Sequence, residues 1–307
     1  MTIDKVENLS ETDFIDSYLA SNKPVIVLDG MRDWDLTRFT PDSLKKELGS
    51  FETQVYNNLF DLQDVTSLND YLTNNFSRPD KECTEYIRWY TKLKNADFCW
   101  SDTAFEQLRD AWTHPTFLPK SSLVVPFGDT NTEKDITTSR YPYKGLFISA
   151  KGARTRLHRD PFGSNAILCQ LFGEKEVILY DPSQAEYLMS GQDFVDVKKP
   201  DHSRFPNFKN ASPNYHLTLK PGEIILFPSG WFHDVTCLTD SISITWNFLY
   251  HTEKERLIDF VKENPADDQL EILFFFFSDM LGKHITVNDL LKFLENSEMV
   301  EEQRISI

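Results

Sequence analysis

One stretch of this chain carries both its fold signal and its chemistry: TRLHRDPFGSNAILCQLFGEK, residues 155–175. Its centre is His158-Arg159-Asp160. In an extended strand alternate side chains project to the same face, so His158 and Asp160 point together with Cα atoms roughly 6–7 Å apart. This spacing lets an imidazole nitrogen and a carboxylate oxygen bind one metal ion. The stretch therefore predicts two ligands of a metal site.

A third ligand is needed, and the best candidate is His233 in PSGWFHDV, again within strand-like sequence. Two histidines and one carboxylate leave the opposite coordination positions open, which is the ligand set of non-haem Fe(II) oxygenases. His-x-Asp alone is a common accident, and His251-Thr252-Glu253 is a second match of this type. Because that match lies where strand sequence becomes helical, Thr252 and Glu253 are better interpreted as the start of a helix.

From residue 144 the sequence alternates short strand-like segments with tight turns, which is typical of a sandwich or barrel. A short helix is expected after Asp181-Pro182 and a long loop at 190–214. Strands are expected at 145–149, 154–159, 165–172, 174–180, 215–219, 223–227, 231–238 and 241–249. Eight such strands predict a mainly β fold with α flanks, whose core is a double-stranded β-helix, or jelly-roll.

The sequence divides into three parts around this core. Residues 1–143 alternate helix and strand patterns and predict an α/β flank that contributes to the barrel and the substrate entrance. Residues 144–250 form the jelly-roll, and residues 251–307 contain three helix-like segments. The middle one, with LEILFFFF, is apolar on nearly every side, so it must be buried on the barrel or against another chain.

Two features of the flank bear on a site. The polar stretch GDTNTEKDITTSRYPY, residues 128–143, is a candidate mobile loop near a substrate entrance;. Tyr86, Trp89 and Tyr90 could line a pocket, but aromatic residues at such spacings are more typical of a hydrophobic core.

The composition predicts a globular protein, with 40% hydrophobic and 13% aromatic residues;. No apolar run reaches transmembrane length, and the polar N-terminus predicts neither a signal nor a transit peptide. Four cysteines without C-x-x-C spacing fit reduced thiols in a cytoplasm;. The formal net charge of −16 argues against nucleic acid or an anionic membrane as a partner, whereas a basic or neutral peptide is compatible;.

Four motifs follow one another in the core: HRD at 158–160, GEK at 173–175, PSGWFH at 228–233 and TWNF at 245–248. In this order and spacing the chain resembles the JmjC Fe(II)/2-oxoglutarate oxygenases of the cupin superfamily, and their small hydroxylase branch in particular. The resemblance covers residues 145–249 strongly and residues 11–60 more loosely. It implies that His158, Asp160 and His233 bind Fe(II), with 2-oxoglutarate and dioxygen as cosubstrates and hydroxylation of a C–H bond as the reaction.

The resemblance also implies residues for the distal carboxylate of 2-oxoglutarate. Lys175 stands where the hydroxylase branch has its 2-oxoglutarate lysine, and the competing interpretation is an exposed strand lysine. Thr155 matches the family's threonine, whose hydroxyl bonds the same carboxylate. Strict strand alternation would put Thr155 and His158 on opposite faces, so this role requires a local twist or bulge.

Asn165 and Asn247 are candidates for the carboxylate nearer the metal, and buried asparagines with structural hydrogen bonds are the alternative. Asn165 follows Asp160 one residue later than in close relatives, which can rotate it away. Arg156 shares strand parity with His158 and can point into the pocket as a substrate contact. Arg154 and Arg159 are equally well interpreted as surface ion pairs.

The leading hypothesis for the substrate is a side chain of a protein or peptide, possibly basic, which predicts an open groove. The first alternative is a small metabolite or free amino acid, which predicts a closed, narrow pocket. The second is a non-catalytic cupin-like binding module. Histone-lysine demethylation is disfavoured because the sequence has no reader domain and no Cys/His zinc cluster. Related hydroxylases dimerise through C-terminal helices, so a homodimer is expected here.

Overall fold

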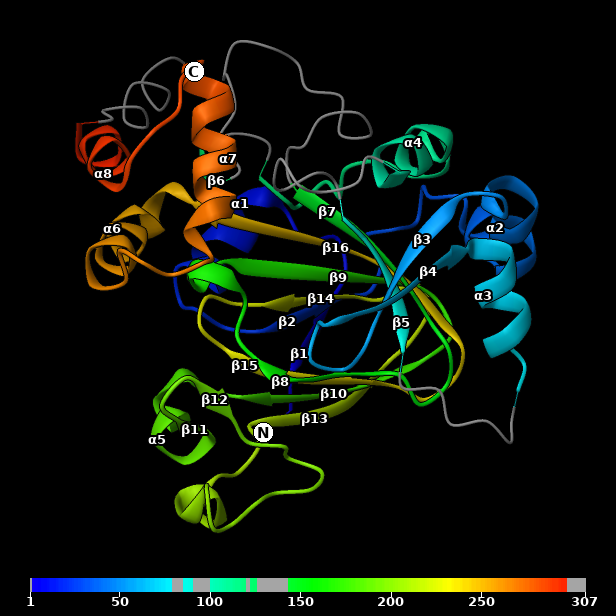
Figure 1. The fold of residues 1–307 in the computed structure, drawn as a ribbon, viewed down its shortest axis with the longest axis horizontal. Coiled ribbons are helices and arrows are strands. Elements are labelled where there is room, and N and C mark those ends of the chain that lie inside the picture. Colours follow the sequence, from blue (N-terminus) through cyan, green and yellow to red (C-terminus); the bar gives the residue numbers. More distant parts are fainter. Residues whose placement is uncertain (1, 79–84, 91–99, 120–121, 126–142, 297–307) are drawn as a thin grey trace.

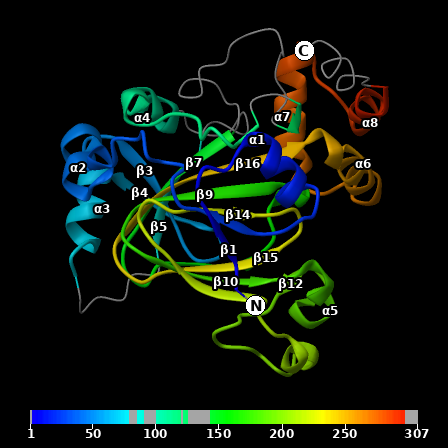
Figure 2. The same cartoon turned by 180° about the vertical axis from the view of Figure 1, so that it is seen from behind.

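Two β-sheets face each other across the centre of the molecule and form the walls of a barrel (Figure 1). The structure, a computed structural model, describes residues 2–78, 85–90, 100–119, 122–125 and 143–296. Seen from behind, the helices Pro41–Leu48, Leu68–Asn75 and Trp100–Gln107 lie at one end of the barrel, and the C-terminal helices lie toward the other, together with the first helix, Glu11–Phe14 (Figure 2). The expected loop at 128–143 lies outside the described residues, apart from its last residue.

Eight strands in the second half of the chain build the barrel, four in each sheet. One sheet takes β7 (Tyr143–Ser149), β9 (Asn165–Phe172), β14 (Ile224–Phe227) and β16 (Ser241–Tyr250). The other takes β8 (Arg154–His158), β10 (Lys175–Tyr180), β13 (Tyr215–Leu219) and β15 (Phe232–Cys237). These are the expected strands with ends displaced by at most two residues, so the predicted double-stranded β-helix is confirmed.

The N-terminal segment adds strands to both edges of the larger sheet. These are β1 (Asp4–Val6) and β2 (Val25–Val27) beyond β14, and β5 (Tyr86–Tyr90), β3 (Glu52–Tyr56) and β4 (Leu62–Ser67) beyond β7. β6 (Leu123–Val125) pairs with the end of β16. The larger sheet therefore has the order β1-β2-β14-β9-β16-β7-β5-β3-β4, and the smaller the order β13-β10-β15-β8. One sheet thus runs across residue 143, where the sequence predicts the end of the flank.

Three helices of the N-terminal segment begin at a serine or threonine side-chain cap. Ser10, Thr40 and Ser67 each accept a hydrogen bond from the backbone N–H three residues later;. The helices are α1 (Glu11–Phe14), the π-helix η1 (Ile15–Leu19), η2 (Leu36–Phe39), α2 (Pro41–Leu48), α3 (Leu68–Asn75), α4 (Trp100–Gln107) and η3 (Arg109–Ala111). Their core reaches the larger sheet where the rings of Trp34 and Trp112 contact Trp246 of β16.

The segment between β10 and β13 contains more regular structure than the sequence predicts. It consists of η5 (Pro182–Gln184), α5 (Ala185–Leu188), β11 (Met189–Ser190), β12 (Asp193–Phe194) and η6 (Pro206–Asn210). Leu188, Val195 and Phe205 pack with Tyr180 and Phe232 of the smaller sheet. The expected long loop at 190–214 is therefore anchored on the barrel wall.

The C-terminal helices pack over the end of the barrel where β16 finishes (Figure 1). They are η7 (His251–Glu253), α6 (Lys254–Glu263), α7 (Leu270–Leu281) and α8 (Val287–Asn296). As expected, His251-Thr252-Glu253 starts a helical turn. In α7, Leu273 and Phe277 are fully buried among α6 and α8, whereas Phe274 and Phe275 are partly exposed. None of the described helices is long and apolar enough to cross a membrane.

Candidate metal centre

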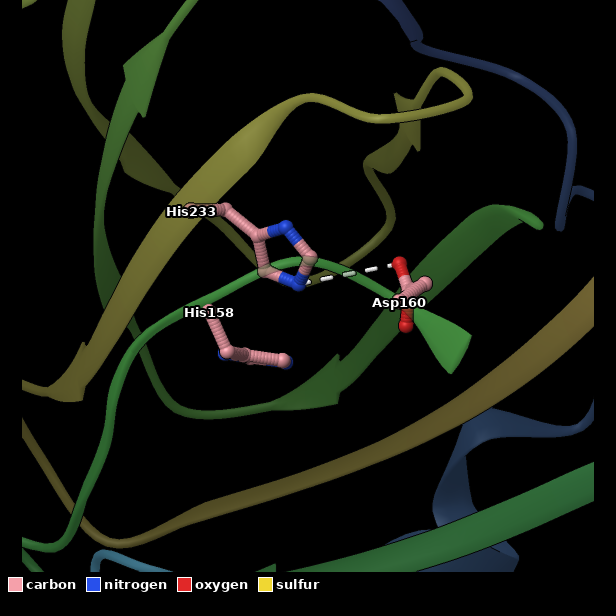
Figure 3. A group of neighbouring side chains, drawn as sticks. All are labelled: His158, Asp160 and His233. Atoms are coloured by element: carbon pink, nitrogen blue, oxygen red, sulfur yellow. Dashed lines mark ion pairs between the residues drawn. The ribbon is translucent and has the colours of Figure 1, made fainter. Parts of the chain in front are cut away.

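His158, Asp160 and His233 lie together inside the barrel, and Figure 3 shows the carboxylate and the two imidazoles gathered at one place. Their candidate ligand atoms all lie within 4.8 Å of one another. Pairing of β8 with β15 sets His158 opposite His233, with ring centroids 4.2 Å apart. Oδ2 of Asp160 is 3.7 Å from Nε2 of His233. The three residues expected as ligands thus form one group that can hold a metal ion.

Backbone carbonyls orient both imidazoles. Nδ1 of His158 lies 2.8 Å from the carbonyl oxygen of Arg156, and Nδ1 of His233 lies 3.3 Å from that of Trp231. A carbonyl oxygen only accepts a hydrogen bond, so each Nδ1 carries the proton. The lone pair on each Nε2 is therefore free for a metal ion, as in metal sites whose ligands are oriented by a second hydrogen bond.

The protonation states of these side chains suit a bound cation. Burial, with a smaller effect from the neighbouring His233, lowers the pKa of His158 to about 3, and burial lowers the pKa of His233 to about 4. Burial raises the pKa of Asp160, opposed by His158 and by a hydrogen bond from Asn247. Neutral imidazole is the form that binds metals, and a cation would favour the Asp160 carboxylate. The donor set fits a divalent ion of the Fe(II) type.

A β-bulge in β8 brings Thr155 to the same cavity as His158. In the ladder with β15, His233 faces His158 and Val235 faces Thr155, so two steps on one strand match three on the other;. A bulge of this kind is the departure from strand alternation that a role of Thr155 beside His158 requires. Both Thr155 and His158 consequently line the cavity around the candidate metal site.

The same bulge turns Arg156 away from the metal cavity, although regular strand alternation predicted that its side chain would point into that cavity. Arg156 instead lines an adjoining pocket of about 480 Å³, here called the outer pocket, with its Nε 3.6 Å from Asp196. Arg159, for which a surface ion pair was one of the open interpretations, lines the metal cavity with its guanidinium 5.1 Å from the Phe232 ring centroid. Arg154 does form ion pairs, with Asp234 and Asp196, but its side chain is only 11% exposed.

Lys175 places its ammonium in the metal cavity, at the start of β10. The residue is 3% exposed, and Nζ donates a 2.6 Å hydrogen bond to Oγ of Ser243. No carboxylate of the described residues pairs with Nζ, and burial lowers the pKa of the ammonium. An uncompensated buried cation is costly. A carboxylate in the cavity would supply the missing counter-charge. Because Lys175 is buried, the interpretation as an exposed strand lysine is wrong.

The two candidate asparagines differ in position. Asn247 of β16 lines the cavity, and its Nδ2 donates a 2.8 Å hydrogen bond to Oδ1 of Asp160. Asn165 lies outside the cavity lining: its amide donates to Glu253 at 2.6 Å and accepts from the N–H of Ser229 at 2.9 Å. The structure thus brings Asn247, but not Asn165, to the metal ligands.

The cavity has a volume of about 370 Å³. Its lining includes the expected residues Thr155, His158, Asp160, Lys175, His233 and Asn247. Aromatic rings hold the two imidazoles in place: Phe227 stacks on His233 at 4.4 Å, and Phe60 packs edge-on against His158 at 5.2 Å.

Phe60, Arg88 and Ile272 also line the cavity, and the sequence analysis did not identify them. The guanidinium of Arg88 lies 4.8 Å from the ring centroid of Phe60 and 4.9 Å from that of Tyr90. Arg88 and Tyr90 are two residues apart in β5, so their side chains point to the same face of the strand. Because Tyr90 was a candidate pocket residue, this spacing could have identified Arg88 as well. Phe60 and Ile272 come from a turn and from a distant helix, where no local pattern points to the site.

Comparisons with known proteins agree with this geometry. Over 99% of its length the chain is 27% identical to the 2-oxoglutarate and iron-dependent oxygenase JMJD4 of Gallus gallus, covering 75% of that protein. It is 27% identical to the arginine-specific demethylase JMJ20 of Arabidopsis thaliana, covering 79% of this chain and 56% of the relative. It is 26% identical to the tRNA wybutosine-synthesizing protein 5 of Gallus gallus, covering 76% and 72%.

These relatives confirm the resemblance to JmjC-type oxygenases that the four motifs carry. The family model of the cupin-like domain matches residues 11–256, which include the barrel and all three candidate metal ligands. By that match, the chain belongs to the cupin-like domain family.

Proposed function

We propose that this chain is an Fe(II)- and 2-oxoglutarate-dependent oxygenase that hydroxylates a side chain of a protein or peptide. One observation carries the proposal. A group of three ligands and a buried lysine without a carboxylate partner among the described residues line one cavity. A metal-binding module without catalysis would need the ligands but has no use for the lysine beside them. The name of the JMJD4 relative supports the same chemistry.

His158, Asp160 and His233 would hold the iron through two Nε2 atoms and one carboxylate oxygen. When bound, iron and 2-oxoglutarate together supply the use of dioxygen to oxidise a C–H bond. Asn247 holds the Asp160 carboxylate through its 2.8 Å hydrogen bond, which fixes the carboxylate relative to both imidazoles;. The rings of Phe60 and Phe227 keep water from the far faces of the two histidines.

Lys175 would bind the distal carboxylate of 2-oxoglutarate, with Thr155 donating a hydrogen bond to the same group. Ser243 orients the ammonium through the 2.6 Å hydrogen bond that it accepts. A buried carboxylate-ammonium contact is a strong, charge-assisted hydrogen bond. Because both residues line the cavity of the three ligands, one bound molecule can reach the metal and Lys175 together.

A protein or peptide substrate is favoured by the outer pocket, which adjoins the metal cavity through Phe194. A metabolite would need the cavity alone, whereas an extended chain can occupy both spaces. The lining of the outer pocket holds three carboxylates, Asp193, Asp196 and Asp201, and three cations, Arg156, Lys199 and Arg204, so it carries no charge excess. The formal net charge of the whole chain is −16. A substrate with Lys or Arg beside the hydroxylated residue fits this charge.

The test is incubation of the protein, Fe(II) and 2-oxoglutarate with extract of host cells, separated afterwards into protein and metabolite fractions. We expect mass gains of one oxygen atom in peptides, and none with Asp160→Ala. If only small metabolites gained mass, the substrate would be a metabolite and not a protein or peptide. If neither fraction gained mass, the proposed activity would be contradicted.

A further inference from the structure

The chain turns sharply directly after the candidate ligand Asp160, in the helical turn η4 (Pro161–Gly163). Phe162 has φ of 44° and Gly163 has φ of 67°. Glycine adopts positive φ readily, but a bulky residue such as phenylalanine does so only at a cost in conformational free energy. Something outside the turn must therefore hold Phe162 in this conformation.

Contacts with the C-terminal helices hold it. The Phe162 side chain is 3% exposed and belongs to the hydrophobic core built with α6, α7 and α8. Its backbone N–H donates a 2.5 Å hydrogen bond to Oε1 of Gln269, the residue before α7. Both the ring and the N–H of this residue are thus engaged by the segment that follows the barrel.

The far end of the same loop is attached to the C-terminal segment as well. Asn165, which starts β9, donates a 2.6 Å hydrogen bond to Glu253, and the same Glu253 oxygen accepts from the N–H of Tyr250 at 2.9 Å. Ile272 of α7 meanwhile lines the metal cavity itself. The loop that follows Asp160 is therefore fastened at two points, Phe162 and Asn165, by residues beyond the last barrel strand.

We propose that the C-terminal helices position Asp160 for metal binding, and that Gln269 is the positioning residue that does so through Phe162. The family match ends at residue 256, so Gln269 and α7 lie beyond it. Asn247 holds the carboxylate of Asp160, while Gln269 holds the backbone two residues further on, at Phe162. This inference rests on the proposed function, because it concerns the affinity of the same three ligands for their metal.

The experiment compares Gln269→Ala, Gln269→Glu and Asn264→Ala in the full chain, with Mn(II) alone as the probe. The Asn264 side chain donates to the Phe260 carbonyl within α6, so its loss weakens the same helical region without touching η4. Dissociation constants come from the electron paramagnetic resonance signal of free Mn(II), and thermal unfolding of each metal-free variant is recorded beside them.

We expect Gln269→Ala to weaken Mn(II) binding about tenfold, as for other residues that orient metal ligands. Gln269→Glu keeps an acceptor for the Phe162 N–H and should stay within about twofold of the wild type, as should Asn264→Ala. Equal affinity of Gln269→Ala and the wild type would overturn the inference. So would an equal loss in all three variants, since that is a general effect of lower stability.

Failure of the proposed function would look different. If the wild type and Asp160→Ala bound Mn(II) equally weakly, the three ligands would not be a metal site at all. If the wild type bound tightly, Asp160→Ala did not, and Gln269→Ala matched the wild type, only the positioning role would fall.

Discussion

The ammonium of Lys175 and the hydroxyl of Ser243 are joined by a 2.6 Å hydrogen bond inside the barrel, which links the two sheets that face each other. Among the described residues no carboxylate completes this pair. Burial lowers the pKa of Lys175, which means that the cavity disfavours the charged form until an anion arrives;.

We expect Lys175→Ala to weaken 2-oxoglutarate binding by about 2–4 kcal/mol, or roughly 30-fold to 1000-fold. Mn(II) binding should stay unchanged, because Lys175 is not a ligand. Titration of 2-oxoglutarate into the Mn(II)-loaded protein gives the first affinity, and the electron paramagnetic resonance signal of free Mn(II) gives the second. Lys198→Ala is the matched control, since Lys198 pairs at the surface with Glu176 of the same strand β10. An unchanged affinity in Lys175→Ala would assign the distal carboxylate to another residue.

Thr155→Val tests the consequence of the β-bulge. Valine keeps the shape of threonine but removes the hydroxyl, so the variant should lose one charge-assisted hydrogen bond to the distal carboxylate of 2-oxoglutarate. We expect a loss of about 1.5–3 kcal/mol, or roughly 10-fold to 150-fold in the dissociation constant. The same titration gives the value, and Mn(II) affinity serves as the internal control. A full wild-type affinity would show that Thr155 lines the cavity without contacting the cosubstrate.

The buried histidines predict a pH dependence of the stability of the metal-free protein. In the unfolded chain imidazole titrates near pH 6.5, whereas burial lowers the pKa of His158 to about 3 and of His233 to about 4. Below about pH 6.5 the unfolded state therefore binds more protons than the folded state, and stability falls as the pH decreases toward about 4.

Urea unfolding across this range measures the effect. The double variant His158→Gln, His233→Gln removes both groups and should lose stability less steeply over the same interval. Identical slopes for the wild type and the double variant would show that other groups cause the acid sensitivity.

The expected homodimer is now a more specific prediction. Among the described side chains of α7, most apolar ones are covered within the chain, and the partly exposed rings of Phe274 and Phe275 remain for a second copy. Light scattering should give about twice the 35.8 kDa of one chain, and Phe275→Asp should give a monomer. A monomer mass for the wild type at micromolar concentration would contradict the prediction.

The barrel could be predicted from sequence because each strand repeats one simple pattern. Short alternating or apolar segments are bounded by turn residues, and the eight expected strands are the eight that form the walls;. β4 was missed because LQDVTS is largely exposed and has no clear alternation, and β6 because its three residues are too few to show a period. Strand patterns report burial, so an exposed or very short strand leaves little signal.

The three residues expected as metal ligands do lie together, whereas the residues around them were predicted only in part. Thr155 and Arg156 are neighbours in a strand, so in regular alternation only one of them could share a face with His158. The bulge in β8 brings Thr155, and not Arg156, to the cavity. Asn165 was displaced from the cavity because its partner, Glu253, comes from the far end of the chain. Contacts between distant segments, such as Gln269 with Phe162, have no local pattern from which to predict them.

The central claim is that His158, Asp160 and His233 hold an iron ion that works with 2-oxoglutarate. The most direct measurement is succinate formation from 2-oxoglutarate in the presence of Fe(II), followed by nuclear magnetic resonance for the wild type, Asp160→Ala and Asp64→Ala. Asp64 is an exposed carboxylate of β4 and serves as the control. We predict succinate with the wild type and with Asp64→Ala, and none with Asp160→Ala. Undiminished succinate formation by Asp160→Ala would contradict the account.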